Sequence, residues 1–334
     1  MNFTLTILGS ASALPFSDRN PSAQALSVHG RLFLIDCGEG TQQRIRQEHL
    51  SFVKIEAIFI SHIHGDHVFG LFGILSTMSL YHRVAPLHIY GPGNLGPILN
   101  FYRSYFGADL SYEIVFHPLD FTVPTVIAGA GNPSSDVSLR STPPIAGDGP
   151  LPLTMPRAVW PSEGQPAPAY GSKHIVVTAF PLNHKIDCYG FRFDEVVGPR
   201  RNPWKPRSYA YVSDTAPFPE LAEYVKGVDL LYHEATYPAD MGDKAEQYFH
   251  STTVQAAVCA RDARVGKLLT GHFSSRVKDI PALAGECRGI FPESYTVNDG
   301  DVFEIPYIRE YEESSPVVVG NADGSDGPVG HSAE

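Results

Sequence analysis

The feature that most restricts the fold is an apolar run, a histidine-rich turn and an apolar helix pattern between residues 55 and 83. IEAIFI is typical of a buried strand, SHIHGDH is too polar for a strand interior, and HVFGLFGILSTMSLYHR has helical spacing of its apolar side chains. A strand that ends in a polar turn before a helix exposes that turn at the edge of a sheet. Residues 62–67 are therefore expected to lie at a sheet edge, open to a ligand.

The side chains of this turn are of the types that zinc prefers. In an extended loop, residues two positions apart share a side, so His62 and His64 can face one metal ion. Gly65 permits a sharp turn that directs Asp66 and His67 toward a second ion. Imidazole nitrogen mixed with carboxylate oxygen favours zinc over magnesium or calcium, whose sites are built from oxygen. The turn predicts two half-sites of a metal centre, and the alternative is a set of solvated loop histidines.

Two metal ions need more ligands than one turn supplies. His184, Asp214 and His272 each end a β-rich run, namely VVTAFPLNH, SYAYVSD and KLLTGH. Each of them alone could be an ordinary polar residue of a loop. Because all three follow strands, as the first motif does, they are expected to converge with it on the metal centre.

Similar strand and loop patterns occur in both halves of the chain. Strands are expected at residues 2–8, 31–35, 55–60, 87–91, 112–119, 174–184, 188–193, 209–214, 228–236, 267–275 and 301–306. Helices are expected over residues 67–83, between 91 and 112, and over 252–263. Strands that alternate with helices in two similar halves predict an α/β protein with two sheets packed face to face and helices outside, an αββα sandwich.

Composition limits the domain organisation and the kind of partner. The 334 residues are 43% hydrophobic, which is enough for one large globular domain over residues 1–309. Residues 122–173 are rich in Pro and Gly and are expected to form an insertion, and residues 310–334 are expected to be a disordered acidic tail. A net charge of −11 excludes a generally basic nucleic-acid surface, so any contact with RNA must be local.

Cysteine usage and hydropathy bear on location. Cys37, Cys188, Cys259 and Cys287 are scattered without a C-x-x-C pair, which predicts reduced, structural thiols in the cytoplasm. No window holds 18 uninterrupted apolar residues, and the N-terminus alternates like a strand. Neither membrane insertion nor secretion is expected.

The order of several short motifs resembles that of one family. HIHGDH, PLNH, SDT, HEAT, FHSTT and GHFSSR follow one another as in ribonuclease Z, a tRNA 3′-processing endonuclease of the metallo-β-lactamase superfamily. LGSASALPFSDRNPSA and LIDCGEGTQ also resemble its N-terminal motifs. H-x-H-x-D-H alone indicates only the superfamily, whereas DCGEGTQ, HEAT and HFSSR narrow the resemblance. It covers residues 1 to about 120 and 174–306.

The resemblance implies a metallo-β-lactamase fold over residues 1–309 and a zinc-dependent endoribonuclease that removes the 3′ trailer of precursor tRNA, leaving a 3′-hydroxyl. Two zinc ions per chain are implied, with Mn2+ or Fe2+ as substitutes, and such pairs stabilise the attacking and leaving oxygens of a phosphodiester. The family pattern divides seven ligands between the ions: His62, His64 and His184 for one, Asp66, His67 and His272 for the other, and Asp214 as the bridge.

The resemblance also implies roles in catalysis and in substrate binding. Asp66 matches the family's proton acceptor, His250 the histidine that assists the leaving oxygen, and Glu234 the carboxylate that orients it. Ser274 and Arg276 follow a ligand closely and are expected to hold a phosphate oxygen of the substrate. The alternatives are that His250 merely precedes the cap of a helix and that Arg276 is an ordinary surface side chain.

One departure from the family concerns the substrate. Many ribonuclease Z enzymes carry a long tRNA-clasping arm between the PLNH and DT motifs, but here residues 185–213 span only 29 positions. GPRRNPWKPRS could be a reduced phosphate-binding hairpin or a solvated turn, and its basic and aromatic side chains are Arg200, Arg201, Trp204, Lys205 and Arg207. SDT also replaces the more usual GDT, a change that should be tolerated.

Three functions therefore remain to be compared. The first is processing of precursor tRNA by a homodimer, as family members commonly form. The second keeps the same metal site but gives it a small phosphodiester or another ester, which the short arm and acidic charge favour. The third is a non-catalytic RNA-binding scaffold, which would be expected to have lost ligands, although all seven are present.

Overall fold

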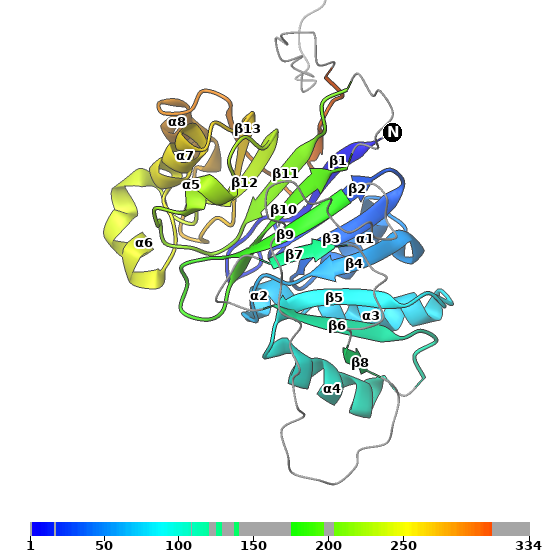
Figure 1. Ribbon diagram of the computed structural model, residues 1–334. Coiled ribbons are helices and arrows are strands. Elements are labelled where there is room, and N and C mark those ends of the chain that lie inside the picture. The colour runs from blue at the N-terminus through cyan, green and yellow to red at the C-terminus, as the bar shows by residue number, and fades with distance from the viewer. Residues whose placement is uncertain are drawn as a thin grey trace, which may run out of the picture.

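Two β-sheets pack face to face with helices on both outer faces, which confirms the predicted αββα sandwich (Figure 1). The computed structural model describes residues 2–16, 18–107, 109–119, 175–196 and 204–308, and the backbone of residues 125–128 and 137–139. In spatial order, the first sheet comprises β15 (Val302–Glu304), β1 (Phe3–Gly9), β2 (Ala23–Val28), β3 (Arg31–Cys37), β4 (Ile55–Phe59), β5 (Leu87–Pro92), β6 (Ile114–Leu119) and β8 (Val137–Leu139).

The second sheet comprises β14 (Ser294–Thr296), β13 (Lys267–Gly271), β12 (Leu230–Glu234), β11 (Ser208–Val212), β10 (Tyr189–Glu195), β9 (Ile175–Pro181) and β7 (Thr125–Ala128). The α-helices are α1 (Thr41–Gln47), α2 (Gly65–Val68), α3 (Leu71–Leu80), α4 (Leu95–Phe106), α5 (Leu221–Tyr224), α6 (Gly242–Tyr248), α7 (Thr253–Asp262) and α8 (Ile280–Arg288). Two 3-10 turns are η1 (Phe52–Lys54) and η2 (Ala239–Met241). Helices α1, α3 and α4 cover the first sheet, and α5, α7 and α8 cover the second (Figure 1).

Alternation along the strands assigns side chains to the layers. On β3, Phe33 and Ile35 enter the core between the sheets, whereas Leu32 and Leu34 pack under the helices. The core between the sheets is aromatic: the Phe59 ring lies 5.4 Å from Phe191 and 5.3 Å from Phe193, between centroids. Because helices cover both outer faces, strand residues of either parity are apolar, which explains continuous runs such as IEAIFI.

The strand directions bring the polar turns to one place. Strands β3 to β6 run parallel to one another, as do β11 to β14. The carboxyl ends of parallel strands meet at one edge of a sheet, and loops at that edge are the usual place for ligands. The turns after β4, β9, β11 and β13 therefore face one another across the two sheets.

The helix predicted over residues 67–83 is divided into α2 and α3. The interruption lies at Gly70, where an added Cβ would come within 2.1 Å of the Gly38 carbonyl oxygen. The Gly70 N–H also donates to the Cys37 carbonyl at 2.8 Å. This close approach needs a residue without a side chain, and it ties the histidine-rich turn to the end of β3.

Several shorter elements were not predicted, namely β2, β7, β8, β14, α1, α5, α6 and α8; β7 and β8 lie in the segment expected to be an insertion. In α1, only Thr41 and Ile45 are buried, so its seven residues show no apolar stripe. The four cysteines are buried and unpaired, as expected. Most of the 122–173 insertion and the 310–334 tail lie outside the described residues. Within the described part of the chain, no helix is both long and apolar enough to span a membrane.

Candidate metal centre and active site

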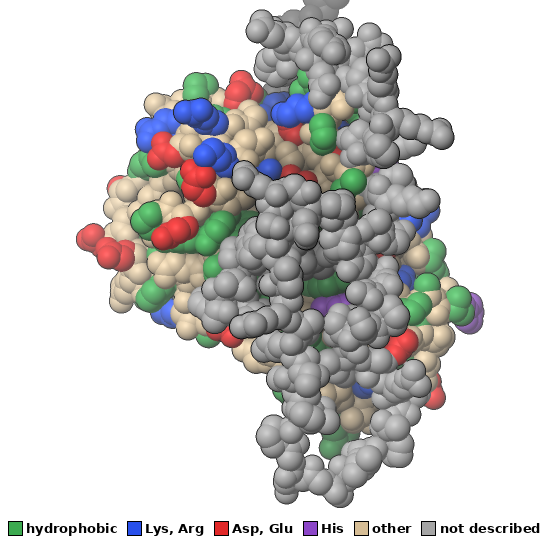
Figure 2. Space-filling view, viewed as in Figure 1, with side chains coloured by type: hydrophobic (Ala, Val, Ile, Leu, Met, Phe, Trp, Pro, Cys, Tyr) green, Lys and Arg blue, Asp and Glu red, His purple; other side chains and the backbone are tan. Residues whose placement is uncertain are grey.

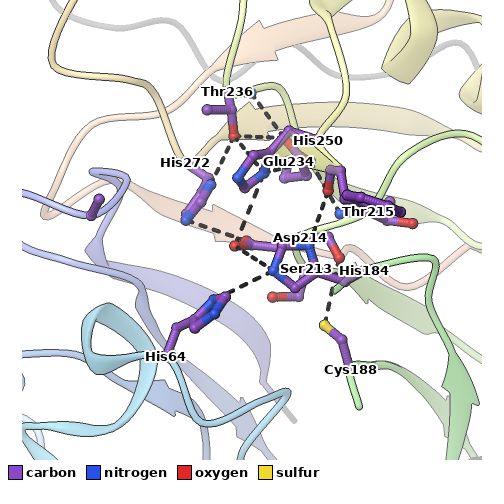
Figure 3. A network of polar contacts seen from close by, with 12 residues as sticks. His64, His184, Cys188, Ser213, Asp214, Thr215, Glu234, Thr236, His250 and His272 are labelled. Carbon is purple, nitrogen blue, oxygen red and sulfur yellow. Dashed lines mark hydrogen bonds and ion pairs between the residues drawn. The ribbon is translucent and has the colours of Figure 1, made fainter. Parts of the chain in front are cut away.

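The structure brings all seven predicted ligands together. One group of potential ligand atoms comes from His62, His64, His184 and Asp214, and a second from Asp66, His67 and His272, with the atoms of each group within 4.8 Å of one another. A third, overlapping group adds His250 to Asp214 and His272. Figure 3 shows Asp214 between His64 on one side and His272, His250 and Glu234 on the other.

Distances in the first group suit a single ion. A tetrahedral site with bonds of about 2.0–2.2 Å places its ligand atoms roughly 3.3–3.6 Å apart. The His64 Nδ1 atom lies 3.0 Å from His62 Nε2 and 3.4 Å from His184 Nε2. Asp214 Oδ2 lies 3.5 Å from His62 Nε2 and 4.0 Å from His184 Nε2.

The second group has the same spacing. His67 Nε2 and His272 Nε2 are 3.2 Å apart, and Asp66 Oδ2 lies 3.6 Å from the first and 3.4 Å from the second. The other oxygen of the shared carboxylate, Asp214 Oδ1, lies 3.5 Å from His67 Nε2 and 3.2 Å from His272 Nε2. Each oxygen of Asp214 thus faces one group, which is the arrangement of a bridging ligand.

The partners of the outer ring nitrogens fix which tautomer each histidine adopts. His67 Nδ1 donates to Asp36 Oδ2 at 2.8 Å, and His184 Nδ1 donates to the Phe249 carbonyl at 3.0 Å. Both partners can only accept. The Nε2 atom of each neutral ring therefore carries a lone pair directed at the site.

Hydroxyl groups give the same result for the other two histidines. Thr236 donates its hydroxyl proton to Glu234 Oε2 at 2.7 Å, so its oxygen accepts from His272 Nδ1 at 2.9 Å. Ser61 likewise donates to Asp36 Oδ2 at 2.8 Å and accepts from His62 Nδ1 at 3.0 Å. With Nδ1 protonated in both rings, Nε2 is again the free ligand atom.

This proton arrangement tests whether a cation fits. When both rings are neutral, the Nε2 lone pairs of His67 and His272 face each other, and Asp214 Oδ1 is buried beside them without a hydrogen bond from a described residue. Burial alone would lower the pKa of His67, but the Asp214 and Asp66 carboxylates outweigh it and raise the pKa, so this position favours a positive charge. Lone pairs and a carboxylate oxygen in van der Waals contact repel one another, and a buried acceptor without a partner costs about 1–3 kcal/mol. A cation between these atoms removes both penalties, so the residues fit a metal ion.

Burial and charge set the ionisation of the ligands. Burial lowers the pKa of His62, His64 and His184, and neighbouring histidines lower it further, so these rings stay neutral. Burial opposes ionisation of Asp214, but His272, His67 and other rings hold its pKa well below the usual range. Neutral imidazoles and an ionised carboxylate are the forms that bind metal.

A main-chain group holds the Asp66 carboxylate. The Ala13 N–H donates to Asp66 Oδ2 at 2.7 Å, from a loop that is far away in the sequence. The loop is anchored just before this contact, because Ser12 N–H donates to the Phe273 carbonyl and Phe273 N–H to the Ser10 carbonyl. Asp66 Oδ2 thus has a fixed orientation beside the second group of ligands.

His250 lies beside the ligands but is engaged elsewhere. Its Nδ1 atom lies 3.1 Å from Glu234 Oε1 and 4.0 Å from Asp214 Oδ2. Burial alone would lower the pKa of His250, but the Glu234 and Asp214 carboxylates outweigh it and raise the pKa to about 9. Because Nδ1 donates to Glu234, the ring presents Nε2 as the nitrogen that can release a proton.

The alternative interpretation of His250 was that it merely precedes the cap of a helix. Thr252, two residues later, is the N-cap of α7: its side chain accepts from Gln255 N–H, and the Gln255 side chain accepts from Thr252 N–H. The cap therefore does not use the His250 ring. The same segment passes the site, where Ser251 N–H donates to Glu234 Oε1 at 2.7 Å.

Backbone strain is concentrated at this site. Eight non-glycine residues of the described chain have positive φ, and four of them touch the site: Ala13, Asp36, Phe249 and His272. Each such residue costs of order 1–3 kcal/mol and persists only where the surrounding contacts hold it. The strain identifies a region shaped for function.

Comparison with known proteins identifies the family. A ribonuclease Z of Cytophaga hutchinsonii is 36% identical and the match covers 94% of this chain and 100% of that protein. A ribonuclease Z of Bacteroides thetaiotaomicron is 31% identical, with 94% and 99% coverage. This chain belongs to the ribonuclease Z family.

A solved structure agrees with this membership. Human short-form tRNase Z is 30% identical and matches 91% of this chain and 99% of that chain, with a TM-score of 0.66. A family model described as anti-Pycsar protein Apyc1 also matches residues 3–100, which include the histidine-rich turn. The chain is thus a ribonuclease Z-like, metal-dependent hydrolase with the metallo-β-lactamase fold.

The two residues expected to bind substrate in this ribonuclease Z family member follow β13. Ser274 N–H donates to the Thr236 carbonyl at 3.2 Å, so Ser274 lies directly behind the His272 ligand. Arg276 is exposed, and it forms no ion pair with any residue that the structure describes. Its guanidinium is available for an anion, although no contact places it at the metal site.

The hypothetical phosphate clamp is only partly described, because Arg200 and Arg201 lie outside the described residues. Lys205 forms an ion pair with Asp229 at 2.9 Å. Arg207 is 2% exposed and forms an ion pair with Glu195 at 2.9 Å. The interpretation of Arg207 as a clamp residue is therefore wrong: it is a buried structural cation.

The visible surface gives the same picture of charge. On the part of this face that is not grey, Lys and Arg side chains lie among Asp and Glu side chains over helices α5 to α8 (Figure 2). No continuous basic area occupies that part of the face. The net charge of −11 likewise indicates that any contact with RNA phosphates is local.

Sequence reasoning missed the residues that orient the ligands. Asp36 is fully buried and accepts hydrogen bonds from His67 and Tyr211 and two from Ser61. It ends the apolar run LFLID, the same signal that identified Asp214, so it could have been found. Thr236 lies in the HEAT motif but was given no role, and Ala13 acts through its main chain, which no sequence signal reveals.

Proposed function

We propose that the domain formed by residues 1–309 is a zinc-dependent endoribonuclease that removes the 3′ trailer of precursor tRNA and leaves a 3′-hydroxyl on the tRNA. The observation that carries this proposal is the pairing of two ligand groups around Asp214 in a chain of the ribonuclease Z family. His62, His64 and His184 would hold one ion, Asp66, His67 and His272 the other, and Asp214 both. Bound there, the ions supply Lewis acidity at the scissile phosphate and a more acidic water.

Asp66 is the proposed proton acceptor. Its Oδ2 atom is held by Ala13 N–H, while Oδ1 makes no hydrogen bond or ion pair with any residue that the structure describes. A carboxylate with one oxygen fixed and the other available can orient a water molecule and accept its proton. The position of Asp66 beside both His67 and His272 supports this role.

His250 is the proposed general acid. The contact with Glu234 Oε1 fixes the ring and keeps Nδ1 protonated, so Nε2 can give its proton to the leaving oxygen. Glu234 is itself held by the N–H groups of Thr215, Thr236 and Ser251. Ser274 and Arg276 are proposed to hold the phosphate oxygens on the side of β13.

A homodimer is the proposed assembly, in which a second subunit would help to present the RNA. Helix α4 supports this, because Phe101, Tyr105 and Phe106 are 58%, 71% and 72% exposed and lie against one another. Clustered exposed aromatics are typical of protein interfaces. Four buried, unpaired cysteines support a reducing compartment, the cytoplasm.

The test is a cleavage assay on two substrates, with Asp66→Ala protein as the blank. We expect wild-type protein loaded with zinc to cut precursor tRNA at one site and the Asp66→Ala variant to be inactive. Hydrolysis of bis-p-nitrophenyl phosphate without cleavage of precursor tRNA would replace this proposal with a small-phosphodiester function. Elemental analysis that finds at most one zinc per chain would contradict the two-ion centre.

A further inference from the structure

A cleft of about 370 Å3 opens next to the turn that carries the ligands His62, His64, Asp66 and His67. This volume lies within the ~300–1,000 Å3 range of small-molecule sites. Two segments connect the cleft to the centre. Phe69 lies two residues after the ligand His67, and Pro15 belongs to the loop whose Ala13 N–H holds Asp66. A substrate whose phosphate lies at the metals therefore has an adjoining group within reach of the cleft.

The Phe69 ring forms a fixed, open wall of this cleft. It is 68% exposed, which is unusual for an aromatic side chain. The ring is nevertheless held in place, because it packs on Gly65, where an added Cβ would come within 2.3 Å of the ring. The Cδ2–Cε2–Cζ edge of the ring thus rests on the ligand turn, while much of the side chain remains open to solvent. An exposed ring held in this way is suited to stack on another flat ring.

The other walls are polar but carry almost no charge. Amide side chains come from Asn20, Gln42 and Gln43, and the single ionisable lining group is the exposed Glu39. The Gln42 amide nitrogen donates to Thr77 Oγ1, which fixes this side chain. None of the described lining residues is Lys or Arg.

This lining discriminates between the parts of a nucleotide. A phosphate requires cationic or N–H-rich surroundings and is repelled by a carboxylate such as that of Glu39. A nucleobase is flat, uncharged and edged with donors and acceptors, and amide side chains can pair with these groups. The cleft therefore favours a base over a second phosphate.

We propose that this cleft binds the base of a nucleotide next to the scissile phosphodiester, stacked on Phe69 with its edge toward Gln43 and Asn20. This inference rests on the proposed function, because it names a second part of the same substrate. The subsite would position the RNA strand through a base, on a protein surface that offers few basic side chains for its phosphates.

The experiment compares Phe69→Ala with Tyr81→Ala. Tyr81 is a matched control, because it is 53% exposed and lies just after the opposite end of α3. KM is measured for precursor tRNA and for thymidine 5′-(p-nitrophenyl phosphate), a chromogenic ester with one base. We expect Phe69→Ala to raise both KM values by about 5- to 150-fold, the usual effect of removing one stacking aromatic, with a much smaller change in kcat. Phe69→Trp should restore them.

Abasic substrates locate the bound base. Precursor tRNA is prepared with an abasic nucleotide on either side of the cleavage site. At the position that stacks on Phe69, the penalty of Phe69→Ala should disappear, because the variant and the substrate remove the same contact. A penalty that persists undiminished in every abasic substrate would overturn the proposal. So would KM values for Phe69→Ala that equal those of Tyr81→Ala.

The thymidine ester separates this inference from the proposed function. If wild-type protein cuts the ester but not precursor tRNA, the ribonuclease function fails. The change in KM for the ester caused by Phe69→Ala still tests whether the cleft binds a base. Calorimetric binding of thymidine 5′-monophosphate to wild-type and Phe69→Ala protein makes the same comparison without turnover. Equal affinities of the two proteins would overturn the base-binding subsite.

Discussion

Replacement of Asp36 by Asn tests whether a buried carboxylate outside the ligand set controls the metal centre. Asp36 Oδ2 accepts from Ser61 Oγ, His67 Nδ1 and Tyr211 OH, and Oδ1 accepts from Ser61 N–H at 2.7 Å. An Asn side chain can keep its oxygen at the Oδ2 position only by placing its NH2 group against the Ser61 N–H. The reverse orientation would direct the NH2 group at the other three donors.

The magnitude follows from these contacts. In the better orientation, one hydrogen bond is lost and two buried donors face each other, at about 1–3 kcal/mol for each unsatisfied group. We therefore expect the free energy of unfolding to fall by about 2–6 kcal/mol. His67 would donate to a neutral amide oxygen in place of a carboxylate, which makes Nε2 a weaker ligand. Loss of such a partner usually lowers metal affinity by about 10–100-fold.

The assay is competition for zinc between the protein and a chelator, followed at neutral pH below the unfolding temperature. Glu195→Gln is the matched control: Glu195 is a buried carboxylate that accepts from Arg207 and His29, at the end of β10 away from the metal centre. We expect both variants to lose stability and only Asp36→Asn to lose zinc affinity. Wild-type zinc affinity in folded Asp36→Asn protein would refute the reasoning.

Three further predictions concern other parts of the structure. Asp214→Ala should reduce bound zinc from about two ions per chain to at most one, by elemental analysis, because its two oxygens face the two ligand groups. His250→Ala should keep its zinc but cleave precursor tRNA about 10²-fold more slowly or worse, and the deficit should shrink for p-nitrophenyl esters, whose leaving group needs no proton; equal deficits would assign His250 to structure. Burial opposes ionisation of Glu195, but hydrogen bonds from Arg207 and His29 hold its pKa below the ordinary value of 4.5. Its contribution to stability is therefore present above about pH 4.5 and lost as the pH falls through the lower folded pKa, so chemical unfolding of Glu195→Gln should depend less steeply on acid pH than that of wild type.

Much of the site could be predicted because its signals are local. The spacing of His62, His64, Asp66 and His67 in one short turn restricts these side chains to one neighbourhood. The prediction of His184, Asp214 and His272 as ligands rested on their position at the ends of strands. Parallel strands bring such ends to one edge of a sheet. The αββα sandwich followed from the strand and helix patterns in two halves together with the family resemblance.

The errors arose where a residue's role depends on its surroundings. Arg207 was grouped with basic neighbours in the sequence, but just before β11 it forms a buried ion pair with Glu195, and its guanidinium carbon lies 3.7 Å from the centre of the Tyr307 ring. The helix over residues 67–83 was drawn as continuous because periodicity does not register the contact between Gly70 and Gly38. Charge and periodicity can be read from the sequence, whereas the burial of a residue depends on which other segments pack against it.

The sequence by itself determined the ligand types, their order and the family, because these depend on residue identity and short spacing. Only the tertiary structure decided which atoms act: Asp36 and Thr236 set the tautomers of His67 and His272 from distant segments. It also decided the contact of Ala13 with Asp66 and the cleft beside Phe69. Hydrogen bonds and clefts are formed between segments that are remote in the chain, so their geometry exists only after the two sheets have packed together.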